Sequence, residues 1–94
     1  MDKLRVGVVG CGIGREHVAA FQKLPDLFEV TAVCDSAPGR AQAAAGELGI
    51  ACATASYDEL CRMDAVDVIA VCTPSYLHYE QSLQALAAGK HVIC

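Results

Sequence analysis

The sequence predicts one α/β domain built on a doubly wound parallel sheet of about five strands, with helices on both faces. Its 94 residues leave room for a single core. Five short runs rich in Val and Ile do not alternate with polar residues, which is typical of strands covered on both faces. Helical segments separate the runs with short connections, and this order requires parallel pairing through right-handed crossovers.

The strands are predicted from these runs and the helices from the segments between them. The expected strands are Leu4–Val9, Val30–Cys34, Ile50–Ala53, Val66–Cys72 and His91–Cys94, and the expected helices are 14–24, 37–48, 57–63 and 76–88. We expect the last strand to be an edge strand. Because exposed edges pair with other chains, we expect self-association there.

Start and stop signals mark the second and third helices. Ser36 and Pro38 are expected to open the second helix, and Gly49 is expected to close it. Ser56, followed three positions later by Glu59, predicts a capping box at the start of the third.

The last helix carries the clearest helical periodicity. Its apolar residues recur at helical spacing and predict one stripe that faces the sheet: Tyr76, Tyr79, Leu83 and Leu86. Ser75 stands where an N-cap belongs, and Gly89 follows the helix where a left-handed closing residue is needed.

Charge and hydropathy exclude two classes of partner. The net charge is −4 and the basic residues are scattered, whereas a nucleic-acid footprint needs a basic stripe. No apolar run approaches the ~18 residues of a membrane-spanning helix, and the first run is too short for a signal peptide. We therefore expect a cytoplasmic protein that binds neither nucleic acid nor membrane.

The six cysteines form no Cys-x-x-Cys pair and no Cys/His cluster, so no zinc site is expected. Four of them lie within or at the ends of apolar runs, where free cysteine packs as a small hydrophobic residue: Cys34, Cys52, Cys72 and Cys94. We expect reduced, buried thiols.

A glycine-rich turn joins the first strand to the first helix. Gly10 lets the chain turn sharply, and Gly12 lets the backbone approach a pyrophosphate without a Cβ in the way. The amides around Ile13 and Gly14 open the helix, whose N-terminus favours anions. This placement between strand and helix predicts a Rossmann-like dinucleotide site.

An acidic residue ends the second strand near the ~20-residue offset at which a carboxylate meets an adenosine ribose. Asp35 can accept hydrogen bonds from both ribose hydroxyls, and Ser36 follows it. A carboxylate there repels a 2′-phosphate, so the cofactor is expected to be NAD rather than NADP. Arg40 is the one nearby feature that could accommodate NADP.

The spacing of the glycines leaves alternatives open. In a strict G-x-G-x-x-G motif the third glycine would stand at Arg15, whereas it stands at Gly14, so either the turn is short or Arg15 occupies a crowded position. The loop also resembles that of methyltransferases that bind S-adenosylmethionine, although these usually carry an acidic residue where Val8 stands. A kinase-like phosphate loop is excluded, because no Gly-Lys-Ser/Thr follows the turn.

Two segments, 71–80 and 87–94, resemble the Gfo/Idh/MocA oxidoreductases. The resemblance covers the whole chain and includes the glycine turn followed by His17, Asp35 at the end of the second strand, and a Thr-Pro segment in which Ser75 replaces the usual Asn. It implies that Thr73, Pro74 and His78 lie near the nicotinamide.

The resemblance also implies hydride transfer between NAD(P) and a sugar, cyclitol or similar polyol. We further expect a homo-oligomer. The family's Glu-Lys-Pro motif, with its catalytic lysine, and its substrate domain would follow residue 94, so residues 1–94 are expected to be a C-terminally truncated dinucleotide-binding domain that binds cofactor without turnover. His17 and His78 have no partner in the sequence and favour packing roles. A non-catalytic NAD-sensing module is the remaining alternative.

Overall fold

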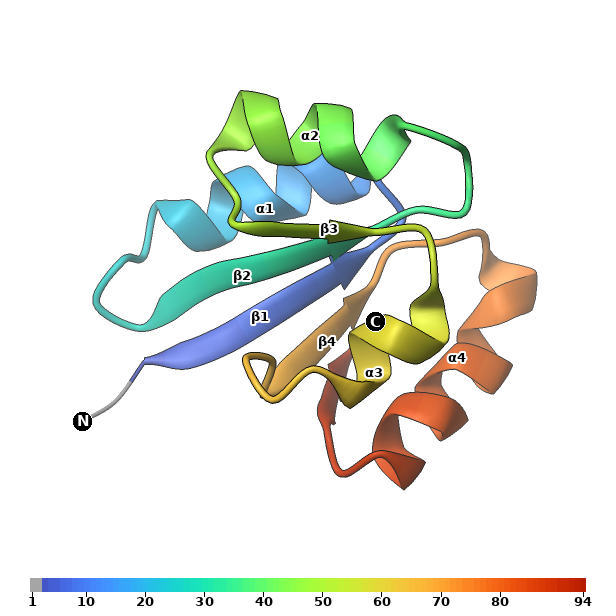
Figure 1. Cartoon of the computed structure of the whole chain (residues 1–94). Coiled ribbons are helices and arrows are strands. Elements are labelled where there is room, and N and C mark those ends of the chain that lie inside the picture. The colour runs from blue at the N-terminus through green and yellow to red at the C-terminus, as the bar shows by residue number, and fades with distance from the viewer. Residues whose placement is uncertain (1–2) are drawn as a thin grey trace.

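The computed structural model describes residues 3–94, and in it the chain folds around one parallel sheet with strand order β3-β2-β1-β4-β5 (Figure 1). This confirms the predicted doubly wound class. The elements in chain order are β1 (Leu4–Val9), α1 (Gly14–Gln22), β2 (Phe28–Cys34), α2 (Arg40–Leu48), β3 (Cys52–Thr54), α3 (Tyr57–Arg62), β4 (Val68–Val71), α4 (Ser75–Ala87) and β5 (His91–Ile93).

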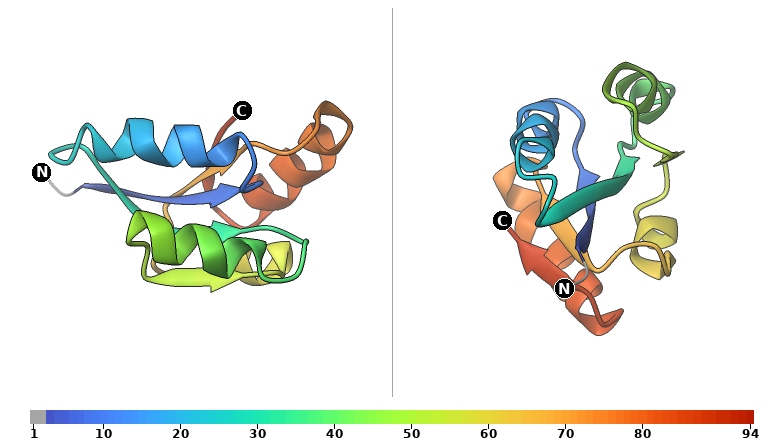
Figure 2. Two further views of the ribbon diagram at one scale, coloured as in Figure 1. Left: turned by 90° about the horizontal axis from the view of Figure 1, so that it is seen from above. Right: turned by 90° about the vertical axis from the view of Figure 1, so that its left-hand side faces the viewer.

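The helices form two layers, one on each face of the sheet (Figures 1 and 2). α1 and α2 cover one face, where Val18 and Ala44 pack against strand residues such as Val8. α3 and α4 cover the other, where Leu60 and Ala85 are fully buried. Within residues 3–94, no helix is long and apolar enough to cross a membrane.

Several predicted boundaries shift by a few residues, and one helix begins later than expected. α2 does not start at Ser36 or Pro38, because the chain first makes a turn in which the Asp35 carboxylate accepts a hydrogen bond from the Ala37 amide. The helix begins after Gly39, which has a positive φ of 78° and no side-chain cap. The hydrogen bond to the Asp35 side chain therefore delays the start of α2 despite the helix signals of Ser36 and Pro38.

The predicted apolar stripe of α4 is wrong. Four of its residues are largely exposed: Tyr76 (81%), Tyr79 (75%), Leu83 (50%) and Leu86 (57%). The face that is turned inward carries the fully buried Ala85 and the half-buried Leu77 and Gln81. The periodicity thus predicts the helix correctly but not the face that it buries.

The ends of α3 and α4 test the capping predictions. Ser56 Oγ accepts a hydrogen bond from the Glu59 amide at 3.2 Å, as predicted. Ser75 does not cap α4, because it is already the first helical residue and Pro74 precedes it as N-cap. Gly89 closes α4 with φ +81°, which lets the Lys90 amide reach the Ala85 carbonyl at 3.0 Å.

The prediction of buried thiols is correct for part of the set only. All six cysteines are free, and Cys11, Cys34 and Cys61 are buried. Cys52 and Cys94 are exposed, because they lie on or beside the two edge strands, β3 and β5. Within residues 3–94, no three His, Cys, Asp or Glu side chains gather as a metal ion would require.

An ion pair joins β1 to the start of β4 at the end of the sheet where the strands begin. The Arg5 guanidinium and amide donate three hydrogen bonds to the Asp67 carboxylate, at 2.9, 3.1 and 2.9 Å. Beside this pair, Lys90 Nζ donates to the carbonyls of Met63 and Val66, both at 2.7 Å. These polar contacts fix β5 and the end of α3 against the sheet.

Acid is expected to weaken this end of the sheet. The hydrogen bonds from Arg5 lower the pKa of the Asp67 carboxyl from 3.8 to about 2. A carboxyl whose pKa is lower in the folded state contributes stability above its unfolded value, and this is lost as the pH falls through the folded one. Between pH ~5 and ~2, the melting temperature should fall more for the wild type than for Asp67→Asn. Parallel curves by circular dichroism would contradict this.

Candidate functional site

Two of the three glycines in the turn between β1 and α1 are required by close contacts. Gly10 has φ +95°, and a Cβ there would lie 2.6 Å from the backbone oxygen of Cys72. At Gly14 a Cβ would lie 3.0 Å from Val8 Cγ1, so this glycine lets α1 pack closely on β1. Gly14 therefore fills the packing role of the third motif glycine.

Arg15 does not occupy the crowded position that the strict motif would give it. Its Nε donates to the Cys11 carbonyl at 3.1 Å, and its guanidinium forms an ion pair with Glu47 on α2. The side chain thus leaves the turn and links α1 to α2.

The second glycine faces open space. A Cβ at Gly12 would meet nothing within 4 Å. Within residues 3–94, the amides of Gly12 and Ile13 also make no hydrogen bond. Free amides at the N-terminus of a helix are the usual binding site for phosphate oxygens.

Asp35 joins the glycine turn to the end of β2. Its carboxylate is 9% exposed, and Oδ2 accepts from the Cys11 amide while Oδ1 accepts from the Ala37 amide, both at 2.9 Å. A guanidinium nitrogen of Arg40 lies 3.7 Å from Oδ2. Each carboxylate oxygen can accept a second hydrogen bond, so the group can still bind hydroxyls from the open side.

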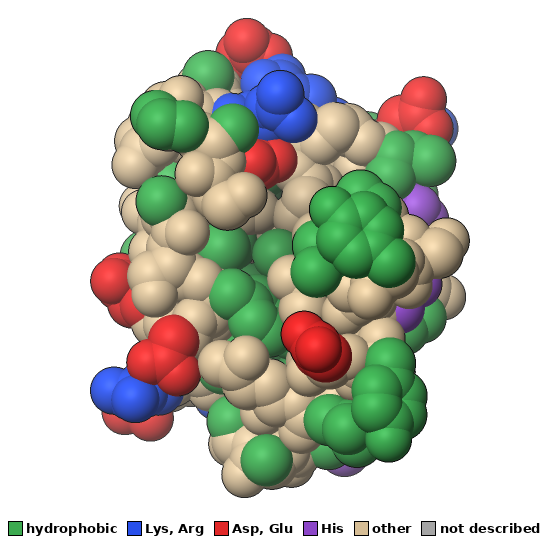
Figure 3. Space-filling view, turned by 90° about the vertical axis from the view of Figure 1, so that its right-hand side faces the viewer, with side chains coloured by type: hydrophobic (Ala, Val, Ile, Leu, Met, Phe, Trp, Pro, Cys, Tyr) green, Lys and Arg blue, Asp and Glu red, His purple; other side chains and the backbone are tan. Residues whose placement is uncertain are grey.

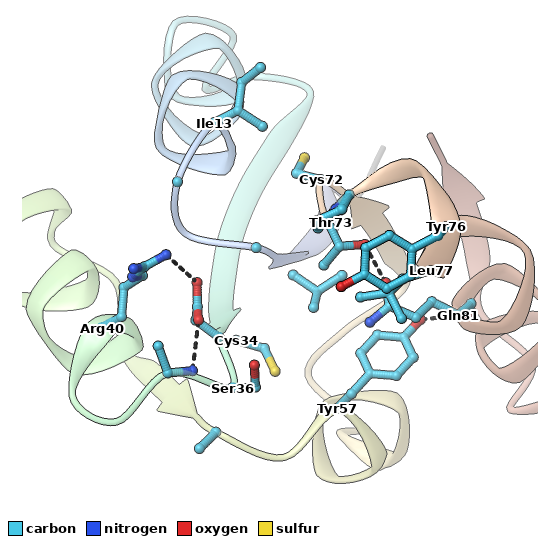
Figure 4. A pocket seen from close by; sticks show the side chains of 17 residues that line it. Ile13, Cys34, Ser36, Arg40, Tyr57, Cys72, Thr73, Tyr76, Leu77 and Gln81 are labelled. Atoms are coloured by element: carbon cyan, nitrogen blue, oxygen red, sulfur yellow. Dashed lines mark hydrogen bonds and ion pairs between the residues drawn. The ribbon is translucent and has the colours of Figure 1, made fainter.

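These groups border one cavity of about 610 Å³ at the carboxyl ends of the strands. Figure 3 looks onto this end of the molecule and shows a hollow with neighbouring basic and acidic groups at one rim and apolar side chains at the other. In Figure 4, Arg40 and Ser36 lie on one side of the cavity, while Thr73, Tyr76 and Gln81 lie on the other. Ligands of doubly wound sheets bind in this crevice, between the ends of β1 and β4.

The wall beside α4 is held by side-chain hydrogen bonds. The Thr73 hydroxyl donates to Gln81 Oε1, and His78 Nε2 hydrogen-bonds to the Thr73 carbonyl oxygen. The Tyr57 hydroxyl at the start of α3 donates to the Gln81 carbonyl at 2.7 Å. Tyr57 and Gln81 therefore connect α3, α4 and the turn after β4 into one surface (Figure 4).

The thiols around the cavity are poorly suited to nucleophilic chemistry. Burial raises the pKa of Cys34 to about 12, and burial also raises the pKa of Cys72. Burial and the negative charge of Asp35 raise the pKa of Cys11, whose Sγ lies 3.5 Å from the Cys34 carbonyl oxygen. Since the thiolate is the reactive form, Cys11 is not an activated thiol despite its place in the turn.

The structure brings most of the predicted cofactor residues together at this cavity. Those that line it are Gly10, Gly12, Ile13, Asp35, Ser36, Arg40, Thr73 and Pro74. Gly14 lies beneath the turn, and the His78 imidazole is turned to the Thr73 carbonyl. His17 is exposed on α1 and does not line the cavity.

Sequence analysis missed several lining residues, notably Tyr57, Tyr76, Leu77 and Gln81. Tyr57 follows the capping Ser56 at the carboxyl end of β3, so its position at the ligand edge of the sheet was a usable signal. Gln81 gives no such signal, because its place depends on which face α4 turns inward.

Comparison with known proteins identifies the family. Residues 4–94 match the family model GFO_IDH_MocA, described as "Oxidoreductase family, NAD-binding Rossmann fold". The chain belongs to this family. Membership decides between the two interpretations of the glycine turn, in favour of NAD and against S-adenosylmethionine.

Its relatives in the Gfo/Idh/MocA family include named dehydrogenases. The chain is 38% identical to inositol 2-dehydrogenase/D-chiro-inositol 3-dehydrogenase of Lactiplantibacillus plantarum over 92 residues, which are 96% of this chain and 26% of that protein. It is 39% identical to D-glucoside 3-dehydrogenase of Escherichia coli, covering 97% and 26% of the two chains. The chain thus spans about a quarter of the length of these relatives.

Solved structures of similar proteins share the fold. A levoglucosan dehydrogenase in complex with NADH and L-sorbose superposes with a TM-score of 0.91 at 29% identity, over 100% of this chain and 27% of that one. A scyllo-inositol dehydrogenase from Lactobacillus casei with bound NAD(H) and scyllo-inositol gives 0.87 at 27% identity, over 97% and 27%.

The glycines of the turn predict two separable phenotypes. Gly12→Ala should leave the melting temperature unchanged, because the added methyl group meets no protein atom, but it should weaken NADH binding about tenfold by crowding the phosphates. Gly10→Ala should instead destabilise the fold by about 1–3 kcal/mol. Calorimetric titration measures the NADH affinity, and thermal melting measures the stability. Unchanged NADH affinity in Gly12→Ala would contradict the placement of the phosphates.

Proposed function

We propose that the chain is the cofactor-holding part of an NAD-dependent dehydrogenase that transfers hydride between nicotinamide and a hydroxyl-bearing carbon of a sugar, cyclitol or similar polyol. The observation that carries the proposal is that the open amides of the glycine turn and the buried carboxylate of Asp35 lie next to each other in the same cavity. The names of several relatives, which are inositol, glucoside and levoglucosan dehydrogenases, support the class of substrate.

The diphosphate and the adenosine ribose of the dinucleotide each have a proposed binding group. The free amides of Gly12 and Ile13 bind the diphosphate, and α1 adds the positive end of its dipole. Asp35 accepts hydrogen bonds from the adenosine ribose, with Ser36 and Arg40 at the same rim of the cavity. When bound, the nicotinamide ring supplies or accepts the hydride.

The turn after β4 is proposed to direct the nicotinamide half out of the cavity. Thr73 and Pro74 line the cavity, and Pro74 restricts Thr73 to an extended conformation. His78 contributes indirectly, because its imidazole is bonded to the Thr73 carbonyl and holds that turn. It is a positioning residue in this proposal, and no catalytic role is assigned to it.

Residues 3–94 hold cofactor but are proposed to lack turnover. Two ionisable side chains of the cavity wall are already engaged, because Asp35 accepts from two amides and the Tyr57 hydroxyl donates to the Gln81 carbonyl. Tyr76, which also lines the cavity, is 81% exposed. Burial also raises the pKa of Tyr57, which disfavours proton release. A hydride donor needs a substrate pocket and a proton-handling group to turn over.

Assembly and location remain predictions. We propose a homo-oligomer, as expected for an exposed edge strand, and a cytoplasmic location, as expected from the composition. The exposed apolar residues of α4 and the unpaired edge of β5 are surfaces on which self-association would occur.

NADH is expected to bind more tightly than NADPH, on the order of tenfold, because the Asp35 carboxylate repels a 2′-phosphate. Arg40→Ala should widen the difference, since it removes the cation that lies 3.7 Å from that carboxylate. Fluorescence titration of both cofactors measures this. Equal or tighter binding of NADPH by the wild type refutes the assignment of Asp35.

The hydride-transfer proposal is tested by NADH formation with inositols and glucosides. We expect no NADH from residues 1–94 alone and polyol-dependent NADH from the complete gene product. Polyol-dependent NADH formation by residues 1–94 alone would overturn the proposal that they bind cofactor without turnover. A gene that ends at codon 94, with NADH binding and a protein partner, would instead identify a non-catalytic NAD-sensing module.

A further inference from the structure

The side of the cavity formed by α3 and α4 has no assigned ligand group. Among the lining residues it contributes Tyr57 on α3 and Tyr76, Leu77 and Gln81 on α4. The two tyrosines offer flat rings and the leucine an apolar side chain, whereas Gln81 offers a polar group. Such a wall fits a flat heterocycle that is recognised at one edge.

The amide of Gln81 has one free donor. Its Oε1 is occupied by the Thr73 hydroxyl, and its backbone carbonyl by the Tyr57 hydroxyl at 2.7 Å. Within residues 3–94, Nε2 of Gln81 has no hydrogen-bond acceptor, although the residue is only half-exposed and lines the cavity. The bond to Thr73 fixes the orientation of the amide, so Nε2 is the atom that it presents to a ligand (Figure 4).

The position of the base follows from the proposed function, on which this inference rests. If the ribose lies at Asp35 and the diphosphate at Gly12, the base attached to that ribose must occupy the remaining part of the cavity. Gln81 lies across the cavity from Arg40 and Ser36, which flank Asp35 (Figure 4). The edge of the base that reaches α4 is therefore the edge farthest from the ribose, which in adenine carries the acceptor N1.

We propose that Gln81 determines base specificity, donating a hydrogen bond from Nε2 to N1 of the adenine while Thr73 holds its amide in place. Tyr57 and Leu77 provide the apolar surfaces on which the ring lies. The class of ligand is thus a dinucleotide whose distal base edge carries an unprotonated nitrogen.

The test is a double-mutant cycle that combines a change of one residue with a change of one ligand atom. NAD and its 1-deazaadenine analogue, in which C–H replaces N1, are titrated calorimetrically into the wild type and Gln81→Glu. The carboxylate of Gln81→Glu keeps an acceptor for Thr73 but offers no donor. Gln42→Glu, which places the same change on the exposed outer side of α2, is the control.

The wild type and Gln42→Glu should bind NAD about tenfold more tightly than the analogue, and in Gln81→Glu this ratio should fall to one or below. Both ligands carry the same charge, so general repulsion by the new carboxylate cancels in the ratio. Equal affinities of the wild type for the two ligands, or a preserved ratio in Gln81→Glu, would overturn the role of Gln81 while leaving the cofactor proposal intact. Binding of neither ligand to the wild type would overturn both.

Discussion

The cavity depends above all on the carboxylate of Asp35, which holds two backbone segments at once. Its hydrogen bonds to the amides of Cys11 and Ala37 join the glycine turn to the turn that follows β2. The first of these bonds is buried and the second partly buried, and a charged acceptor strengthens both. The group proposed to recognise the ribose is therefore also the group that shapes the loop proposed to recognise the diphosphate, so the two functions of the site share one support.

The glycines complete this arrangement by allowing backbone and helix to come close. Gly10 brings the turn against the backbone of Cys72, which places the ends of β1 and β4 side by side. Gly14 lets α1 pack closely on β1. On the opposite face Gly7 lets α3 approach β1, because a Cβ there would lie 3.0 Å from Leu60 Cδ1. Gly12 is different, because the space before it is open. Three of these glycines therefore serve packing, and one faces the ligand side.

The sequence was sufficient to predict the fold class and the part of the cavity formed by the turns after β1, β2 and β4, because both depend on the order and spacing of the elements. Five apolar runs alternating with helices determine a parallel sheet, and residues that follow β1, β2 and β4 must then meet at its carboxyl edge. The wall formed by α3 and α4 could not be predicted in the same way. Gln81 reaches the cavity only because α4 turns a mixed face inward, and the start of α2 is displaced by the hydrogen bond that the Ala37 amide donates to Asp35. The placement of Gln81 depends on tertiary contacts that local patterns do not encode, whereas the bond at Asp35 is a local turn that competes with the helix signals of Ser36 and Pro38.

The unusual orientation of α4 has a physical reason in the turn that precedes it. The turn at Thr73 and Pro74 lies outside any strand or helix, so its polar groups need partners. His78 and Gln81, on the first two turns of α4, supply them by bonding to the carbonyl and the hydroxyl of Thr73. Farther along the helix, Ala85 is small enough to let α4 approach the sheet closely. With this polar and small face turned inward, the bulky apolar residues of α4 are left on the outside, so the hydrogen-bonding needs of one turn explain both the wall of the cavity and the exposed apolar surface behind it.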